Sequence, residues 1–187
     1  GSKIWDVRSV SSFIKSQHSL ALSISKEGDI VILNSSGDLL KIKSNNGRIY
    51  WSLNTTGSLL THGTDFFKSS DIITVDKDII FATSSSIFSF NLDNGYLNWK
   101  KDIGSKNTPI IDGSNVFLVS DNGYFVNLDR QTGKIIWSTN ILKVLKKKKQ
   151  KTYITGFIMG SGKIYAVSLN GYLIICSAVS GNVEYSK

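Results

Sequence analysis

Short apolar segments recur along the whole chain, separated every nine or ten residues by turn signals. Near-continuous apolar runs of four residues are typical of strands that are covered on both faces. Such runs occupy 30–33, 79–82, 116–119 and 164–167. No stretch has a sustained helical period, so the pattern predicts strands throughout and no helix.

The turn signals have the same order in each unit. Asn-Gly and related pairs supply the positive φ values that tight hairpins require. They stand at 27–28, 36–37, 46–47, 112–113, 122–123, 132–133, 161–162, 170–171 and 180–181. In the second unit the first two turns, 76–77 and 85–86, lack glycine, and 94–95 restores the pattern. Four strands per unit follow from these turns.

A longer repeat runs through the same units. Glycine followed four residues later by an aromatic residue occurs at Gly1…Trp5, Gly47…Trp51, Gly95…Trp99, Gly133…Trp137 and Gly181…Tyr185. The first match is weak, because Gly1 resembles a vector-derived residue. The aromatic positions are 46, 48, 38 and 48 residues apart, and periods in this range are typical of solenoids and propellers.

These observations predict an all-β fold, a β-propeller of four-stranded antiparallel blades. We expect a single domain over 1–187, with blades near 19–53, 71–101, 107–139 and 153–186. Four blades make a partial ring, or half of an eight-bladed ring. Long connections at about 54–70 and 140–152 account for the uneven period. A sandwich with coincidental turns is the alternative, which four copies in the same register disfavour.

The glycine and the aromatic residue have a physical role in such a fold. A twisted blade cannot cover both of its faces alone. An aromatic ring on the outer strand can lie across the gap to the next blade, where full burial contributes about 2–3 kcal/mol. Glycine allows the tight turn and close backbone approach. We therefore expect Gly47, Trp51, Gly95, Trp99, Gly133, Trp137, Gly181 and Tyr185 to be docking residues.

The repeat resembles the tryptophan-docking repeat of the pyrroloquinoline-quinone (PQQ)-type propellers, Ala-x-Asp-x-x-Thr-Gly-x-x-x-Trp. The third unit is most similar to it, with Asn127, Asp129, Thr132, Gly133 and Trp137. The other units depart at the first position, which holds Lys41, Ser89 or Ile175. The resemblance covers residues 19–187 and implies the propeller fold without choosing a member.

Among non-enzymatic relatives the chain looks most like the BamB family, periplasmic lipoproteins of the outer-membrane β-barrel assembly machinery. That resemblance implies an eight-bladed propeller without quinone that contacts a BamA partner through inter-blade loops. We accordingly expect a non-catalytic scaffold that binds protein, needs no cofactor, and is periplasmic and outer-membrane-associated. No individual partner-binding residue can be matched to the family.

Two other classes stay open. One is a fragment of a quinoprotein dehydrogenase; members of that class hold PQQ with calcium, use a carboxylate base and often have a disulfide between adjacent cysteines. Cys176 is the only cysteine, and His18 and His62 lack a second ligand at metal spacing. The acids that fall at turns are expected to cap their own backbone: Asp38, Asp76, Asp93, Asp112, Asp121 and Asp129. The second class is a lumenal or periplasmic sensor domain.

The net charge of +8 is concentrated in one segment. Six of the positive charges belong to Lys143, Lys146, Lys147, Lys148, Lys149 and Lys151. A nucleic-acid binder usually spreads basic residues over a groove or face, so no nucleic-acid partner is expected. The lysine cluster is either a solvated inter-blade loop or a contact for an acidic partner or anionic headgroups.

Two general expectations remain. No apolar run is long enough to span a bilayer, and the N-terminus lacks the basic and apolar segments of a signal peptide. A half-ring leaves two blade faces uncovered, so we expect self-association, with two chains completing eight blades around a two-fold axis, or the remainder of a ring.

Overall fold

The computed structural model describes residues 1–7, 21–34, 36–55, 69–145 and 152–187. Within these ranges the chain forms four antiparallel sheets of four strands each, and the strands of each sheet follow chain order. This confirms the predicted all-β propeller architecture.

Each sheet is one blade. The first consists of β1 (Ala21–Ile24), β2 (Ile30–Leu33), β3 (Asp38–Ile42) and β4 (Ile49–Asn54). The second consists of β5 (Ile73–Val75), β6 (Asp78–Ala82), β7 (Ile87–Asn91) and β8 (Leu97–Lys101). The third consists of β9 (Ile110–Asp112), β10 (Asn115–Val119), β11 (Tyr124–Asp129) and β12 (Ile135–Asn140). The fourth consists of β13 (Ile154–Gly160), β14 (Lys163–Ser168), β15 (Leu173–Ser177) and β16 (Val183–Ser186).

One short helical element departs from the strand-only expectation. The 3-10 helix η2 (Ile141–Val144) follows β12, and the Asn140 side chain caps it by accepting a hydrogen bond from the Lys143 backbone N–H. It is too short to show a helical period in the sequence. Ile141 is fully buried, so this turn fastens the start of the connection to the fourth blade.

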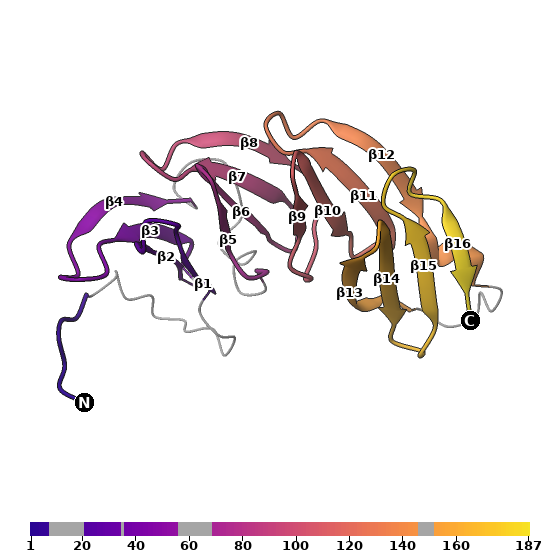
Figure 1. Ribbon diagram of the computed structural model, residues 1–187, viewed down its shortest axis with the longest axis horizontal. Helices are drawn as coiled ribbons and strands as arrows, with labels where there is room; N and C mark the ends of the chain where they lie inside the picture. The colour runs from indigo at the N-terminus through magenta and orange to yellow at the C-terminus, as the bar shows by residue number, and fades with distance from the viewer. Residues whose placement is uncertain (8–20, 35, 56–68, 146–151) are drawn as a thin grey trace.

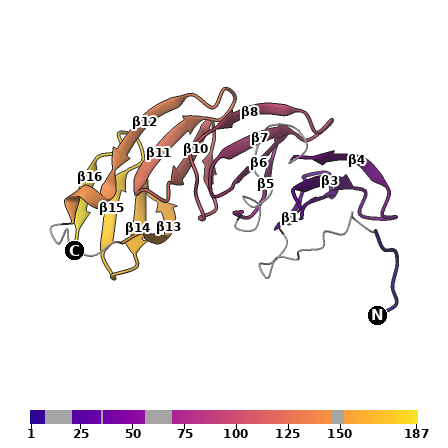
Figure 2. The same ribbon diagram turned by 180° about the vertical axis from the view of Figure 1, so that it is seen from behind.

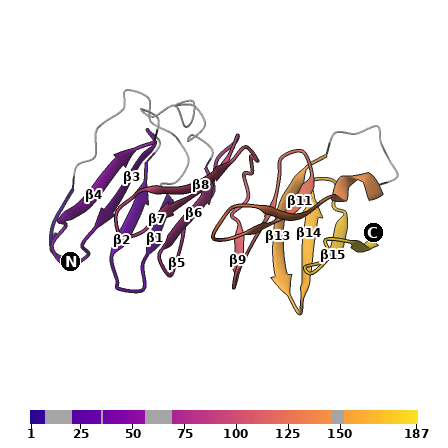
Figure 3. The ribbon, with the colours of Figure 1, turned by 90° about the horizontal axis from the view of Figure 1, so that it is seen from above.

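The blades stand side by side in an open arc (Figure 1). The first strands, β1, β5, β9 and β13, lie along the concave side, and the last strands, β4, β8, β12 and β16, lie along the convex side. The same order is seen from behind (Figure 2). The two termini lie at opposite ends of the arc, as the view from above shows (Figure 3).

Each blade has two apolar faces because side chains alternate along its two middle strands. We call the face toward the preceding blade the receiving face and the face toward the following blade the presenting face. In the second blade the receiving face is Ile79, Phe81, Phe88 and Phe90, and the presenting face is Ile80, Ala82, Ile87 and Trp99. Both sets are buried, which explains the near-continuous apolar runs.

The core therefore consists of three separate layers between blades. The layer between the first and second blades packs Val31, Leu33 and Leu39 against the second blade's receiving face. There the rings of Phe81, Phe88 and Phe90 stack with centroids 5.5–6.0 Å apart. The layer between the second and third blades is mainly aliphatic apart from Trp99. The layer between the third and fourth blades again contains aromatic rings, those of Phe117, Phe125 and Trp137. Stability thus resides in contacts between neighbouring blades.

Candidate functional site: inter-blade joints and the connection face

The joint between the second and third blades shows how the repeated residues meet. The Trp99 indole lies on Gly133 of the following blade, where a Cβ would be 2.6 Å from Trp99 Cδ2. Gly133 has a φ of +66°, a conformation in the left-handed region that favours glycine. The indole N–H donates to the Arg130 carbonyl at 2.7 Å. Glycine thus provides both the turn and the flat surface for the ring.

Two other joints have the same geometry. Trp51 lies on Gly95, and its indole N–H donates to the Leu92 carbonyl at 3.1 Å. Trp5 lies on Gly47, and its indole N–H donates to the Ser44 carbonyl at 2.8 Å. In all three the acceptor is three residues before the glycine. The aromatic residue of one repeat therefore meets the glycine of the next.

The joint between the third and fourth blades differs in its hydrogen bonding. Trp137 lies on Gly181, with a prospective Cβ 2.5 Å from Trp137 Cε3. Its buried Nε1 has no hydrogen-bond partner. The ring instead meets Phe125 edge to face, with centroids 4.7 Å apart and planes at 72°. Apolar packing alone holds this indole.

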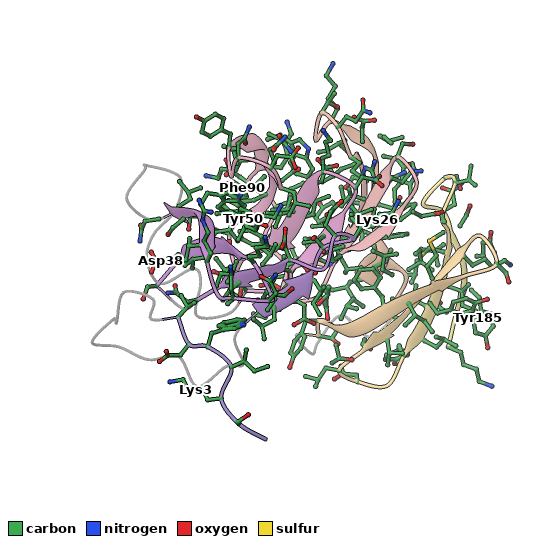
Figure 4. The ribbon with its side chains drawn as sticks, turned by 60° about the vertical axis from the view of Figure 1, so that its left-hand side comes forward. Lys3, Lys26, Asp38, Tyr50, Phe90 and Tyr185 are labelled. Atoms are coloured by element: carbon green, nitrogen blue, oxygen red, sulfur yellow. The ribbon has the colours of Figure 1, made fainter. Side chains whose placement is uncertain are left out.

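The first and last aromatic residues of the repeat differ in whether they contact a docking glycine. The Trp5 ring lies on Gly47. The weak match of Gly1 and Trp5 to the repeat therefore includes a residue with the same contact as the other tryptophans. Trp5 also comes from a segment that the structure shows without a strand. Tyr185 takes the corresponding position on β16, is 46% exposed, and meets no docking glycine among the described residues. Figure 4 shows it at the far end of the molecule from Lys3.

A β-bulge precedes each docking residue, a feature that the sequence did not reveal. Trp51 pairs with Lys41, but the next pair is Ile42 with Ile49, so Tyr50 is the extra residue. The same register shift leaves Asn98, Ile136 and Glu184 unpaired in the other blades. A bulge bends its strand and re-aims the side chains beside it. It accordingly turns the aromatic ring toward the following blade.

Blades that lack residues of the family pattern still form the same turn between their third and fourth strands, which we call the docking turn. The glycine N–H donates to the carbonyl four residues earlier in every blade, at 2.8–2.9 Å. Asp129 also accepts hydrogen bonds from the Thr132 backbone N–H and hydroxyl, and these bonds lower the pKa of Asp129. Asn91 and Ser177 accept backbone hydrogen bonds in the same place. Backbone geometry forms this turn, and a short acceptor side chain supports it in three of the four blades.

The unexpected lysine of the first unit is accommodated inside its own blade. Lys41 is 9% exposed. Its ammonium lies 3.4 Å from the Asp29 carboxylate and 5.2 Å from the centroid of the Tyr50 ring. An ion pair and an aromatic face compensate for the partial burial of the charge. A small residue is therefore not required at this position.

The connections between blades begin on one side of the arc, which we call the connection face. They leave the last strand of one blade at the same strand ends as the turn between the second and third strands. Backbone N–H groups at the start of each connection donate hydrogen bonds to carbonyls of that turn. The pairs are Thr55 to Gly37, Ser105 to Thr83 and Ile141 to Gly123, at 2.9–3.0 Å. The docking turns lie at the opposite strand ends, on what we call the turn face.

One residue of the predicted lysine cluster is seen on the connection face. Lys143 is exposed on η2. Lys146, Lys147, Lys148, Lys149 and Lys151 lie outside the described residues. Nearby, the Lys106 ammonium is 3.8 Å from the Asp121 carboxylate. The connection from the third to the fourth blade thus starts with an exposed lysine.

The turn acids do not all cap their own backbone. Asp129 does so, but Asp38 is 7% exposed and accepts hydrogen bonds from the amides of Asn34 and Asn54. Asp76 has a φ of +50° in a turn that lacks glycine, and it forms an ion pair with Arg130 of the next blade at 2.9 Å. This tight turn presents its carboxylate across the joint.

The same joint holds a second acid. Asp78 lies 3.4 Å from Arg130 Nε and accepts a hydrogen bond from the Asn98 amide. Burial raises the pKa of Asp78, while the guanidinium opposes that shift. Arg130 is 17% exposed in its side chain. These three charged groups link two blades through ion pairs, although the buried Nε of Arg130 has no hydrogen-bond partner.

A calcium–quinone site would need a group of metal ligands, and the ranges that the structure describes are 1–7, 21–34, 36–55, 69–145 and 152–187. No three His, Cys, Asp or Glu side chains in these ranges gather as metal ligands, and His18 and His62 lie outside them. Cys176 is fully buried on the receiving face of the fourth blade, and burial raises the pKa of its thiol to about 11. No helix in the described part could cross a membrane.

Comparison with known proteins agrees with this architecture. The outer membrane protein assembly factor BamB of Yersinia pestis is 22% identical over 182 residues, which cover 90% of this chain and 43% of that protein. The crystal structure of BamB from Moraxella catarrhalis superposes with a TM-score of 0.67 at 19% identity, covering 88% of this chain and 48% of that one. A quinohemoprotein alcohol dehydrogenase from Comamonas testosteroni gives a TM-score of 0.59 at 13% identity, covering 86% and 34%.

The chain spans less than half the length of these proteins. The likeness to the two solved structures shows the fold. The family itself is shown by a match of its sequence profile to residues 1–139, a range that contains three of the four blades. The chain therefore belongs to the family described as outer membrane protein assembly factor BamB.

Proposed function

We propose that this chain is a non-catalytic scaffold that binds protein during the assembly of outer-membrane proteins, in the periplasm. The family match over residues 1–139 supports this role, and so do the names of its relatives.

The joints are the observation that carries the proposal. Indole rings on glycine fix each blade to the next at three places within the arc. A frame of this kind holds its loops at fixed separations, and loops on a rigid frame are where proteins commonly bind partners. The connection face is the side on which those loops gather. We place the contact with a BamA-like partner there.

The lysine cluster supplies the electrostatic part of that contact. Lys143, Lys146, Lys147, Lys148, Lys149 and Lys151 occupy one connection. Each basic residue near an anionic surface contributes about 1 kcal/mol, an effect that salt screens. An acidic patch on the partner protein fits this cluster, and binding should weaken as ionic strength rises.

A titration with a matched control tests the proposal. The periplasmic part of a BamA-type protein is titrated into the chain at several salt concentrations. The triple variant Lys143→Gln, Lys147→Gln, Lys149→Gln should bind more weakly and with a smaller salt dependence. The control replaces Lys26, Lys77 and Lys134 on the turn face by Gln and should bind as the original does. Equal loss in both triples, or no binding by the original chain, would contradict the proposal.

The quinoprotein alternative makes a different prediction. Its support is the fold likeness to the quinohemoprotein alcohol dehydrogenase. An absorbance titration with PQQ and calcium separates the two functions: the scaffold proposal predicts no saturable spectral change, whereas a quinoprotein fragment would give one.

A further inference from the structure

The outermost strands of the four blades differ in how their free edges are protected. Within the described ranges, β4, β8, β12 and β16 each pair with one neighbouring strand, so the other edge of each strand has no strand partner there. These edges lie along the convex side of the arc (Figure 1). A free edge presents unpaired backbone N–H and C=O groups, and natural proteins commonly block it with charged side chains, lysine above all.

Two of the four edges are protected in this way. β8 has Lys100 and Lys101 directly after its tryptophan, and β16 is four residues long and contains Glu184. β4 and β12 have neither a charge nor a proline in six residues, with the sequences Ile-Tyr-Trp-Ser-Leu-Asn and Ile-Ile-Trp-Ser-Thr-Asn. Ser52 and Ser138 stand where β8 has Lys100. The edges of the first and third blades are therefore open to pairing.

The backbone of these two strands directs pairing groups outward at regular positions. The Thr55 N–H donates inward to the Gly37 carbonyl, and the Ile141 N–H donates inward to the Gly123 carbonyl. Backbone groups alternate in direction along an antiparallel strand, so residues one and three positions earlier point outward. These residues are Asn54 and Ser52 on β4, and Asn140 and Ser138 on β12. The bulge lies before the tryptophan, and the four residues from the tryptophan onward keep a regular register.

The side chains beside the two edges are apolar on one sheet face and polar on the other. Trp51 and Leu53 are partly buried on the presenting face of the first blade, and Trp137 is partly buried on that of the third. Trp99 of the protected second blade is 7% exposed. The serines that follow Trp51 and Trp137 are exposed on the opposite face. An added strand would cover apolar surface with every second side chain and leave the others in water.

We propose that the free edges of β4 and β12 bind an extended segment of an unfolded protein chain, in which apolar and polar residues alternate, as a fifth strand of the blade. Backbone hydrogen bonds provide the affinity, and the alternating side chains select the segment. Strands of transmembrane β-barrels have this alternation. The inference rests on the proposed function, because it names the protein under assembly as a second ligand beside the partner on the connection face.

A fluorescence-anisotropy titration with a labelled synthetic peptide of alternating valine and threonine residues tests the pairing. The intact chain should bind this peptide saturably. A second peptide has the same side chains but is N-methylated at neighbouring central amides, one on each of its edges. It should bind at least about tenfold more weakly, because backbone hydrogen bonds are lost on either edge.

A pair of double variants tests the place of binding. Ser52→Lys with Ser138→Lys gives β4 and β12 the lysine that β8 has, and should weaken peptide binding at least about tenfold. Ser114→Lys with Ser180→Lys adds the same charge at exposed positions of the turn face, and should bind the peptide as the original does. Both double variants should still bind the periplasmic part of a BamA-type protein, so a failure of this inference can be told from a failure of the proposed function.

Four results would overturn the inference. They are equal affinity for the two peptides, unchanged peptide binding by Ser52→Lys with Ser138→Lys, equal weakening by both double variants, and no peptide binding by the original chain. Sedimentation of the chain alone adds a further check. Self-association that disappears in Ser52→Lys with Ser138→Lys would assign the edges to a second copy of the chain, and would also contradict the inference.

Discussion

Replacing Gly133 by alanine tests whether the indole contact stabilises a joint. A Cβ there would lie 2.6 Å from Trp99 Cδ2 and 2.7 Å from Cε3, on a residue with a φ of +66°. Gly113 in the same blade has a φ of +57° and no heavy atom within 4 Å of a prospective Cβ. Gly113→Ala therefore has the backbone strain without the clash, and the two variants form a matched pair.

The two effects have different magnitudes. The left-handed conformation costs a non-glycine residue about 1–2 kcal/mol, and alanine offsets roughly 0.4–1 kcal/mol by restricting the unfolded chain. Gly113→Ala should thus lower the free energy of unfolding by about 1 kcal/mol or less. Overpacking against a buried ring adds about 1–3 kcal/mol, so Gly133→Ala should lower it by about 2–4 kcal/mol.

Urea unfolding followed by tryptophan fluorescence, at one protein concentration, measures the difference. In a Trp99→Leu background the ring is gone, so the additional cost of Gly133→Ala should fall toward that of Gly113→Ala. If Gly113→Ala and Gly133→Ala destabilise the original protein equally, the docking contact has no energetic role and the reasoning is refuted.

Three further predictions concern single positions. Gly104→Ala should destabilise strongly, because its Cβ would overlap the carbonyl oxygen of Ser84, whereas Gly156→Ala meets open space; thermal unfolding of both variants gives the comparison. Trp99→Phe should cost more than Trp137→Phe, since the indole N–H of Trp99 donates a hydrogen bond and that of Trp137 has no partner; denaturant midpoints measure this. The pKa of Cys176 is raised from 9.0 to about 11, so the unfolded thiol ionises first and stability should decrease as pH rises from about 9 to about 11. A Cys176→Ala variant should lack that component of the decrease, as urea midpoints across the same pH range can show.

The fold class could be predicted because its cause is local. Hairpin turns need positive φ, and Gly37, Gly123 and Gly171 supply it in the turns between the second and third strands. The two-sided burial of each blade appears directly as a continuous apolar run such as 79–82. These features do not depend on contacts between residues distant in the sequence. The spacing of turn residues and apolar runs is therefore enough to predict the fold class.

Features of the candidate site that depend on contacts between blades could not be predicted. Spacing identifies Trp99 and Gly133 as repeated residues, but the acceptor of the indole N–H is a backbone carbonyl, which has no sequence signal. The ion pairs of Arg130 with Asp76 and Asp78 join residues more than fifty positions apart. The bulges result from strand register, which residue types did not indicate. The role of the lysine cluster stays a proposal.

The recurrent bulge has a consequence for how these blades can diverge. A residue without a cross-strand partner is released from the alternation that fixes its neighbours as inward or outward, and here that slot holds Tyr50, Asn98, Ile136 and Glu184. Three of the four use this freedom within their own blade, beneath the Lys41 ammonium, against Asp78 and Ser89, and beside Lys163. Each sheet can therefore acquire an individual fastening without disturbing the ring-on-glycine contact one residue away.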